Sequence, residues 1–339
     1  MRRHTMILAM LGMAALALAL PLAAAGQGGR TDEPDDGIMG EYVGKYRPEG
    51  GSACEAEAKV IGEGDGQYRC VLTAGEGDKA VKVELKGKAE GKRVALAGRA
   101  GDVEWKGTLE GGEALVAESK TGEFGLKYAT RKSPTEGAKP PAGAVVLLPF
   151  EPGKPTSLDA WCNMDGKPAP WKVLDDGSIV VEGGNLRTKK DMGDVQLHVE
   201  FRCPYMPKDR GQGRGNSGVY LHSRYEVQVL DSFGLEPRDN ECGGIYSVGS
   251  PKVIASLPPG RWQTYDVTFR SPEVADGKIT KPAVVTVRHN GILIHENVKA
   301  DHVTTAGVGG PVVAPAPLML QDHGNAVRFR NIWYTELKD

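Results

Sequence analysis

The chain has 339 residues, enough for two ordinary domains. Its formal net charge of −2 provides no basic surface, so the composition argues against a nucleic-acid partner. Glycine (46 residues) and proline (22 residues) are frequent, as in proteins built from many short strands joined by turns.

The first 25 residues have the features of a secretory signal peptide. Arg2 and Arg3 precede the apolar run MILAMLGMAALALALPL, and small residues follow it, so we expect cleavage near Ala25. A retained membrane anchor is the alternative. Polar, glycine-rich sequence follows at once, however, and no later segment approaches the roughly 20 apolar residues of a spanning helix. We therefore expect a secreted or periplasmic protein with no membrane span in its mature form.

Five cysteines, an odd number, follow the predicted signal peptide. Export permits disulfides, and Cys54 and Cys70 flank an expected hairpin around GEGDGQ. That turn would place Cys70 opposite about Lys59 rather than Cys54, so the sequence leaves this bridge open. A bridge between Cys203 and Cys242 is less favoured, and metal-like CxxC spacing is absent.

Residues 38–131 predict a small all-β domain. Runs such as AVKVELKGKAE, KRVALAGRA and VEWKGTLE alternate with a period of two and are separated by glycine-bearing turns, which indicates a meander or a barrel. The region contains no histidine and no polar cluster, so we interpret it as an accessory domain with a structural or surface-binding role. The stretch SPTEGAKPPAG then predicts an exposed, unpaired linker over residues 132–143.

Residues 144–339 predict a second all-β domain. Eight or more antiparallel strands in this length imply a sandwich, most simply a jelly roll. The clearest hairpin is VVTVRHNGILIHE, because Asn290 and Gly291 form a favoured two-residue type I′ turn. The candidate strands are AVVLLPF, WKVLDDGSIVVEGG, VQLHVEFRC, SGVYLHSRYEVQVLD, WQTYDVTFR, AVVTVRHNGILIHEN, PLMLQDHG and AVRFRNIWYTEL.

One of these candidate strands, within GNSGVYLHSRYEVQVLDSFG, has an unusually polar face. Side chains alternate along a strand, so one face is apolar and the other is polar. The polar face carries Tyr220, His222, Arg224, Glu226 and Gln228. A carboxylate between an arginine and an amide suits the binding of sugar hydroxyls, and with a tuned pKa it can act as a general base. The simpler interpretation is an exposed strand with surface ion pairs.

A second polar run, from Gln321 to Asn325, follows the apolar PLML. It brings amide, carboxylate and imidazole groups together at the end of a predicted strand. His323 belongs to this run, and histidine is the side chain whose ordinary pKa suits proton transfer near neutrality. Phosphate loops, HExxH motifs and serine nucleophile elbows are absent. The two polar runs are therefore the candidate site.

Several long segments, in this order, resemble the 3-keto-disaccharide hydrolase domain family, once a domain of unknown function. They are LPFEPGKPTSLDAW, WKVLDDGSIVVEGG, GNSGVYLHSRYEVQVLDSFG, GGIYSV, PPGRWQTYDVTFRSP, KPAVVTVRHNGILIHENV and PLMLQDHGNAVRFRNIWY. The resemblance runs from about Ala144 to the C-terminus and implies a concanavalin A-like jelly roll acting on sugars oxidised at C3. Two positions depart from the family pattern: in the YLHSRYE phrase His222 stands where the family commonly has an arginine, and Ala326 stands where proline is usual.

The implied reaction needs a base for the acidic C2 proton, an oxyanion stabiliser and an acid for the leaving oxygen. On this hypothesis His323 or Glu226 is the base, and Arg224 or a bound divalent metal ion stabilises the oxyanion. Glu226, Asp322 and His323 are candidate metal ligands if the fold brings them together. The residues expected to contact the sugar are Asn216, Tyr220, His222, Gln228, Asp231, Gln321, Asp322 and Asn325.

Two other functions remain open at this point. A jelly-roll glycoside hydrolase with two carboxylates would use Glu226 and Asp231, but their positions differ in parity, so a β-bulge would have to unite them. A lectin-like module would bind glycans on the same polar face without catalysis. The oligomeric state is also left open.

Overall fold

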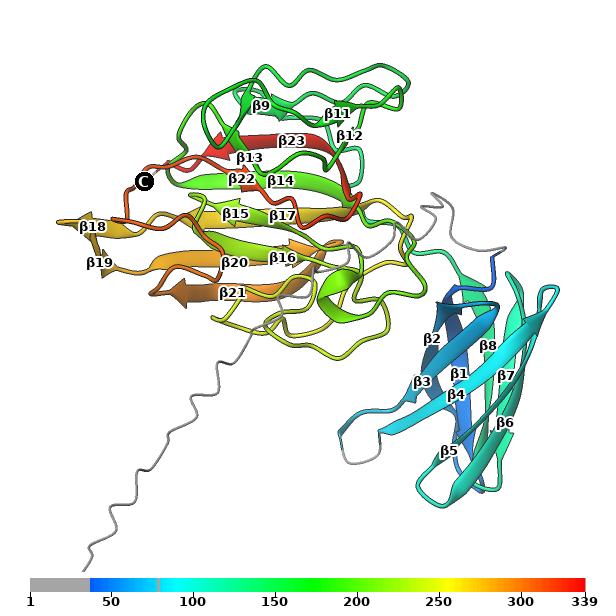
Figure 1. Ribbon diagram of the computed structural model, residues 1–339. Coiled ribbons are helices and arrows are strands. Elements are labelled where there is room, and N and C mark those ends of the chain that lie inside the picture. Colours follow the sequence, from blue (N-terminus) through cyan, green and yellow to red (C-terminus); the bar gives the residue numbers. More distant parts are fainter. Residues whose placement is uncertain (1–36, 78–79, 339) are drawn as a thin grey trace, which may run out of the picture.

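The computed structural model describes residues 37–77 and 80–338 and consists of two all-β domains joined by a short connection (Figure 1). The predicted signal peptide lies outside the described residues. In the described part of the chain, no helix has the length and apolarity that crossing a bilayer requires. The predicted fold class, all-β with a jelly-roll-like C-terminal domain, is confirmed.

The N-terminal domain is a closed antiparallel barrel in which β1 pairs with both β2 and β8. Its strands are β1 (Gly40–Pro48), β2 (Cys54–Gly64), β3 (Gln67–Ala74), β4 (Val81–Glu90), β5 (Arg93–Ala100), β6 (Val103–Glu110), β7 (Ala114–Ser119) and β8 (Gly122–Ala129). Closure leaves no open sheet edge in this domain.

The barrel closes around side chains from alternate positions. In β5, for example, Val94 and Leu96 are buried while Ala95 between them is exposed. Tyr46, Trp105 and Phe124 fill the interior, and the ring centroids of Tyr46 and Phe124 are 4.6 Å apart. The barrel interior is therefore a packed core rather than a ligand cavity.

The C-terminal domain is a sandwich of two antiparallel sheets around one large apolar core. The smaller sheet has the order β10-β13-β22-β15-β16, and the larger has the order β11-β12-β23-β14-β17-β20-β21, with β9 also paired to β23. The smaller sheet contains β10 (Trp161–Asn163), β13 (Leu186–Thr188), β22 (Met319–Leu320), β15 (Ser217–Leu221) and β16 (Tyr225–Val229). The larger contains β9 (Val145–Leu148), β11 (Lys172–Val173), β12 (Ile179–Val180), β23 (Arg328–Glu336), β14 (Val195–Arg202), β17 (Gln263–Arg270), β20 (Ala283–His289) and β21 (Ile292–Ala300). A separate two-stranded sheet joins β18 (Glu273–Ala275) and β19 (Lys278–Lys281).

Two local predictions can be compared directly with the structure. Asn290 and Gly291 both have positive φ angles (52° and 80°) between β20 and β21, which confirms the type I′ turn. The cysteines, in contrast, are all free thiols. Cys54 lies opposite Tyr46 and Cys70 opposite Val60. Neither the Cys54–Cys70 bridge, which the sequence left open, nor the less favoured bridge between Cys203 and Cys242 is formed.

The segment predicted as an exposed linker is instead fixed to the outer face of the larger sheet. Ser133 is buried, and its hydroxyl lies 2.6 Å from that of Thr264. Thr135 donates to Asp266 at 2.7 Å, and the backbone N–H of Gly137 donates to Glu200 at 2.6 Å. The prolines and glycines do prevent strand pairing, but side chains of the sheet supply the hydrogen bonds that a neighbouring strand would have supplied. Within this segment, residues 139–143 form the continuous run of exposed residues.

Limited proteolysis with a protease of broad specificity should therefore cut first within residues 139–143. Residues 133–138 should resist, because a protease needs an extended segment that can leave the surface, and these residues are tied to the sheet. Mass spectrometry of the early fragments locates the cuts. A first cut between Ser133 and Ala138 would contradict the docking of the linker.

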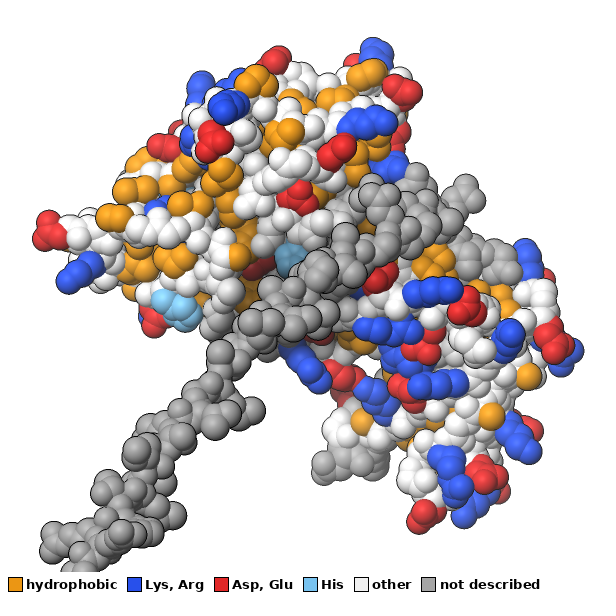
Figure 2. All heavy atoms as spheres, viewed as in Figure 1, with side chains coloured by type: hydrophobic (Ala, Val, Ile, Leu, Met, Phe, Trp, Pro, Cys, Tyr) orange, Lys and Arg blue, Asp and Glu red, His pale blue; other side chains and the backbone are white. Residues whose placement is uncertain are grey.

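Charged side chains of both signs intermingle on the face of the barrel seen in Figure 2. Many of them are cross-strand ion pairs, such as Arg47 with Glu123 at 3.1 Å. Both side chains of this pair are more than half exposed, so the pair contributes about 0–1 kcal/mol to stability. This face of the barrel thus carries intermingled positive and negative side chains rather than a patch of one sign.

Candidate active site

The polar strand predicted from the sequence is a β-hairpin. β15 and β16 pair antiparallel, with Tyr220 opposite Glu226 and Gly218 opposite Gln228. His222 and Ser223 lie in the turn with φ angles of 51° and 56°, in the left-handed region that non-glycine residues rarely adopt. The prediction of one continuous strand is therefore wrong, because period-two alternation cannot distinguish one long strand from two short strands joined by a tight turn.

The two strands of the hairpin nevertheless share one polar face. The three residues of the turn keep the even-numbered positions of both strands on the same side of the sheet, so Tyr220, Glu226 and Gln228 share one face. The opposite face carries Val219 and Val227, which belong to the core. On the next strand, Gln321 follows β22 and its backbone N–H donates to the carbonyl of Gly218 at 3.0 Å. Gln321 thus joins the same polar face.

Glu226 is the chemically distinctive group of this face. It is 2% exposed, and burial raises its pKa to about 8, although a hydrogen bond from Tyr220 opposes the rise. Gly218 makes room for it, since a Cβ on Gly218 would lie 2.5 Å from the Glu226 Oε1 atom. A carboxyl with this pKa exchanges its proton near neutral pH, as a general acid–base group must.

Tyr220 lies beside Glu226 and remains a neutral hydroxyl. Burial, followed by the nearby Glu226 carboxylate, raises the pKa of the Tyr220 phenol well above its ordinary value. Its Oη accepts a hydrogen bond from Gln321 Nε2 at 3.1 Å and lies 3.3 Å from the carbonyl oxygen of Thr305. Tyr220 is therefore held as a hydrogen-bond donor next to the carboxyl group.

Three amide side chains form the far end of the face. Gln212 Oε1 accepts hydrogen bonds from Gln228 Nε2 and from Asn216 Nδ2, both at 3.1 Å. Gln228 and Asn216 are each 1% exposed. Among the described residues, Gln228 Oε1 and Asn216 Oδ1 have no hydrogen-bond partner. A buried acceptor without a partner costs about 1–3 kcal/mol, so these two oxygens are suited to donors from a ligand.

The two remaining residues of the predicted polar ladder, His222 and Arg224, lie in the turn rather than on the face. The His222 ring packs edge-to-face on Phe269 with centroids 4.8 Å apart, and burial lowers its pKa. His222 is a packing residue in this structure, so its predicted contact with the sugar is not supported. Arg224 donates from Nη2 to the carbonyl of Pro311 at 2.9 Å, while its buried Nε has no partner in the described part of the chain.

The segment after β21 crosses over the turn end of the hairpin. The Thr304 hydroxyl donates to the Arg224 carbonyl at 2.8 Å and accepts from the Glu226 N–H at 3.0 Å. On the outer edge of β16, the backbone of residues 243–246 pairs with Gln228 and Glu226. These two segments bury the polar face, which explains why the side chains expected to be solvent-exposed are enclosed.

Asp231, Asp322 and Asn325, which the sequence assigned to sugar binding, are used to hold the local structure. Asp231 forms a buried ion pair with Arg214, with Nε and Oδ2 2.6 Å apart. Asp322 accepts from the backbone N–H groups of Gly184 and Gly324, and Asn325 accepts from the N–H of Asn216. Asp231 is therefore occupied by its arginine and does not form a carboxylate pair with Glu226.

His323 lies beyond the end of β22 and is exposed. We find no hydrogen bond or ion pair between His323 and Glu226. No three His, Cys, Asp or Glu side chains among the described residues gather into a possible metal site, so Glu226, Asp322 and His323 are not brought together as ligands. The suggested metal site is wrong in this form, and the proposed base role of His323 stays a prediction.

Sequence reasoning missed two residues of the site. Gln212 lies in the short 3₁₀ turn η2 (Gly211–Gly213), and Thr304 lies in a glycine-rich loop. Neither has a sequence signal of its own, because each reaches the hairpin only through the tertiary fold.

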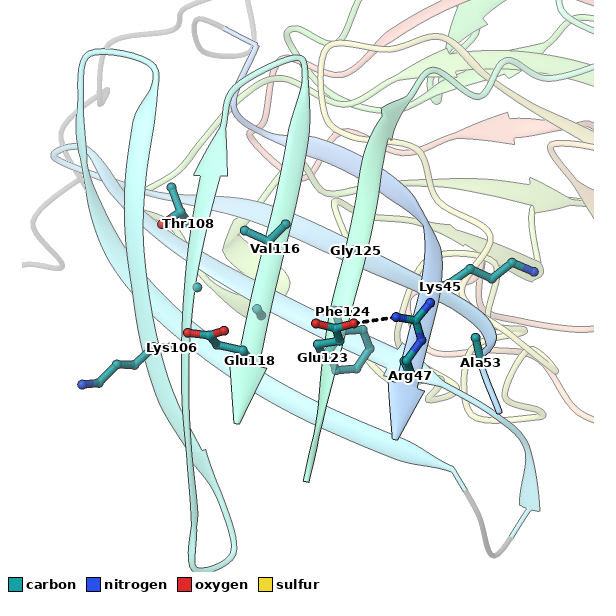
Figure 3. A pocket seen from close by; sticks show the side chains of 12 residues that line it. Lys45, Arg47, Ala53, Lys106, Thr108, Val116, Glu118, Glu123, Phe124 and Gly125 are labelled. Atoms are coloured by element: carbon teal, nitrogen blue, oxygen red, sulfur yellow. Dashed lines mark hydrogen bonds and ion pairs between the residues drawn. The ribbon is translucent and has the colours of Figure 1, made fainter. Parts of the chain in front are cut away.

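A surface hollow with a volume of about 470 Å³ lies elsewhere, on the outer wall of the barrel (Figure 3). Figure 3 shows Arg47 and Glu123 paired beside it and Val116 on its floor. Val116 is 55% exposed. The hollow is a solvated surface and lacks the enclosed titratable groups of the hairpin face, so we place the candidate site on the hairpin.

Comparison with known families and structures points to carbohydrates. The model of the 3-keto-alpha-glucoside-1,2-lyase-like domain matches residues 144–335, and the barrel lies outside that match. The crystal structure of a "putative glycosyl hydrolase" from Parabacteroides distasonis is 33% identical, covers 58% of this chain and 85% of its own, and has a TM-score of 0.52. A second structure with the same description and source is 21% identical, covers 58% of this chain and 95% of its own, and has a TM-score of 0.42. No protein with a curated description matches the chain.

Proposed function

Because the chain belongs to the 3-keto-alpha-glucoside-1,2-lyase-like domain family, we propose that it cleaves the glycosidic bond of glucosides oxidised at C3, with Glu226 moving the proton. The family and the 33% identical structure indicate a carbohydrate-active protein that cleaves glycosidic bonds. The single observation that supports the finer proposal is the enclosed Glu226, with its pKa near 8, beside unpaired amide oxygens. The predicted signal peptide further supports action outside the cytoplasm.

The chemistry begins at C2 of the sugar. A keto group at C3 makes the C2 proton acidic, and its removal gives an enolate with negative charge on the C3 oxygen. When the C3 carbonyl re-forms, a double bond forms between C1 and C2, the bond from C1 to the glycosidic oxygen breaks, and that oxygen takes up a proton. Addition of water at C1 then restores the free 3-keto sugar. Overall, one water molecule is consumed and no oxidant is needed.

Glu226 can serve both halves of this elimination. Its ionised form accepts the C2 proton. In a β-glucoside the leaving oxygen lies on the same face of the ring as that proton, so the protonated carboxyl can return a proton to it; in an α-glucoside the two lie on opposite faces, and a second group or water must supply that proton. A single carboxyl can do this only if its pKa lies near the working pH, as it does here. The neutral Tyr220 hydroxyl, opposite Glu226 in the hairpin, is the donor available to the C3 oxyanion. The oxyanion role of Arg224 stays a prediction, since its guanidinium lies in the turn and donates to the carbonyl of Pro311.

Binding of the sugar follows from the unpaired groups. Gln228 Oε1 and Asn216 Oδ1 are acceptors without partners among the described residues, which suits them to hydroxyl groups of a sugar. This set also fits a lectin-like module, which would bind the sugar and leave it intact. The observation that favours catalysis over binding alone is the raised pKa of the Glu226 carboxyl.

The test assays the mature protein on a chromogenic 3-keto-glucoside and on the unoxidised glucoside in parallel, with and without added divalent metal ions. We expect aglycone release from the keto sugar alone, slowed by deuterium at C2, because the C2–H bond breaks in the elimination. Release from the unoxidised glucoside at a similar rate would favour a direct hydrolase. Binding of both sugars without turnover would favour the lectin-like alternative.

A further inference from the structure

The β2–β3 hairpin of the barrel packs on the C-terminal domain. Ile61 and Val71 form a small apolar cluster with Phe233, and Ile61 and Phe233 are each at most 2% exposed. A Cβ on Gly234 would lie 2.5 Å from Ile61 Cδ1, so the two domains approach closely here. Ile61 alternates with Val60, which faces the barrel core, and therefore points outward into the interface.

The segment 205–216 begins on this hairpin. Tyr205 packs against the core cluster of the barrel, although it belongs to the C-terminal domain. The absence of a side chain on Gly62 admits it, since a Cβ there would lie 2.4 Å from Tyr205 Oη. Arg210 then donates from Nη2 to the carbonyl of Glu63 at 3.4 Å. The first half of the segment is thus anchored on the barrel.

The second half of the same segment enters the candidate site. Gln212 Nε2 donates to the carbonyl of Asn240 at 2.8 Å, which fixes the orientation of its amide. Its Oε1 then faces the NH₂ groups of Gln228 and Asn216, both 3.1 Å away. Because Gln212 Oε1 accepts from the NH₂ groups of Gln228 and Asn216, the amide oxygens of these two residues point away from Gln212. Those are the two buried oxygens that have no partner among the described residues.

We propose that Gln212 is a positioning residue which orients Gln228 and Asn216 as acceptors for sugar hydroxyls, and that the barrel holds Gln212 in place through the 205–216 segment. This inference rests on the proposed function for its substrate, but its structural part does not. It gives the barrel a role in the site although the barrel contributes no residue that contacts the sugar. An amide that can rotate freely would present donor and acceptor in turn, and a hydroxyl donor would bind it less tightly.

The first arm of the test replaces Gln212 by leucine, which removes the acceptor and keeps the approximate size. We expect KM for the 3-keto-glucoside to rise about tenfold, the loss of roughly one hydrogen bond, with kcat changed much less. Lys281→Ala is the control, because the ion pair of Lys281 with Glu273 is exposed and lies off this segment, so its loss should leave KM unchanged. An unchanged KM in Gln212→Leu would overturn the positioning role.

The second arm replaces Ile61 by aspartate, which places a charge in the apolar contact between the domains without touching the barrel core. Hydrogen–deuterium exchange of residues 205–216 should accelerate at least about tenfold, and KM should rise in the same direction as in Gln212→Leu. Val116→Asp, on the exposed outer wall of the same barrel, should change neither. Unchanged exchange of 205–216 in Ile61→Asp would overturn the role of the barrel. If the wild type cleaves no 3-keto-glucoside, the proposed function fails while the exchange arm still decides whether the barrel holds this segment.

Discussion

Replacing Glu226 by glutamine is expected to lower kcat/KM for a 3-keto-glucoside by at least about 10³-fold, within the usual range for a general acid–base group. Glutamine keeps the shape of the side chain and loses its ability to exchange a proton. In the wild type, kcat/KM should rise with pH to a plateau with a midpoint near the pKa of about 8, because the ionised carboxylate starts the elimination. If kcat/KM instead falls as pH rises through about 8, Glu226 acts as the acid and the base lies elsewhere.

The same substitution should make the protein more stable. The pKa of Glu226 is raised from 4.5 to about 8 on folding, so the wild type is penalised relative to the unfolded chain as pH rises from about 4.5 to about 8. At pH 7 this penalty is of the order of 3 kcal/mol, at about 1.4 kcal/mol for each pKa unit. Denaturant unfolding should therefore show Glu226→Gln to be more stable than wild type at pH 7 to 8, with the difference shrinking toward pH 4.5.

Loss of activity together with a gain in stability separates a catalytic carboxyl from a structural one. Glu226→Gln that is inactive and less stable at pH 7 would mean that the carboxylate holds the site together. A variant that keeps its activity would remove Glu226 from the proposed mechanism.

Replacing Glu200 by alanine should destabilise the protein by about 3–5 kcal/mol, as expected when one partner of a buried ion pair is removed. Glu200 is fully buried and accepts from Arg330 Nε at 2.7 Å, Asn331 Nδ2 at 2.8 Å and the N–H of Gly137 at 2.6 Å. Burial alone would raise its pKa, but hydrogen bonds from His198 and Asn331, together with Arg330, lower it overall. Its removal leaves the Arg330 charge, which is stacked on Phe150 and Trp262, without a carboxylate.

This substitution should also free the linker, because Gly137 loses its acceptor. Proteolytic cuts should then appear within residues 133–138, which resist in the wild type. Glu123→Ala is the matched control: its ion pair with Arg47 is exposed, so the free energy of unfolding should change by no more than about 1 kcal/mol. If the free energy of unfolding of Glu200→Ala also changed by no more than about 1 kcal/mol, the charged cluster would not hold the linker.

The pH dependence of this cluster follows from its members. His198 lies between Asp266, at 2.7 Å from its Nδ1, and Glu200, at 3.4 Å from its Nε2. Burial alone would lower the pKa of His198, but hydrogen bonds to these two carboxylates raise it overall. The stability that His198 contributes is therefore present below its unfolded pKa and is lost as pH rises through its folded pKa. The contribution of Glu200 is lost in the opposite direction, as pH falls through its lowered pKa.

The sequence by itself determined the features that depend on local patterns. Period-two alternation gave the all-β class, and the Asn290–Gly291 pair gave the hairpin between β20 and β21, because only residues tolerant of positive φ fit that turn. The order of long motifs identified the family of the C-terminal domain. Alternation also placed Tyr220, Glu226 and Gln228 on one face without any tertiary contact, although it wrongly added His222 and Arg224, which lie in the turn.

Only the tertiary structure decided which polar residues work together. The alternation around His222 is the same for one strand as for two, so the turn, and the removal of His222 from the polar face, came from packing against Phe269. The carboxyl of Asp231 looked free in the sequence and is occupied by Arg214, a neighbour across the hairpin. The pKa of Glu226 depends on burial under segments about 20 and 80 residues away, and Gln212 reaches the site from a loop anchored on the other domain. Burial and hydrogen bonding between distant segments follow from the fold as a whole, and no local pattern encodes them.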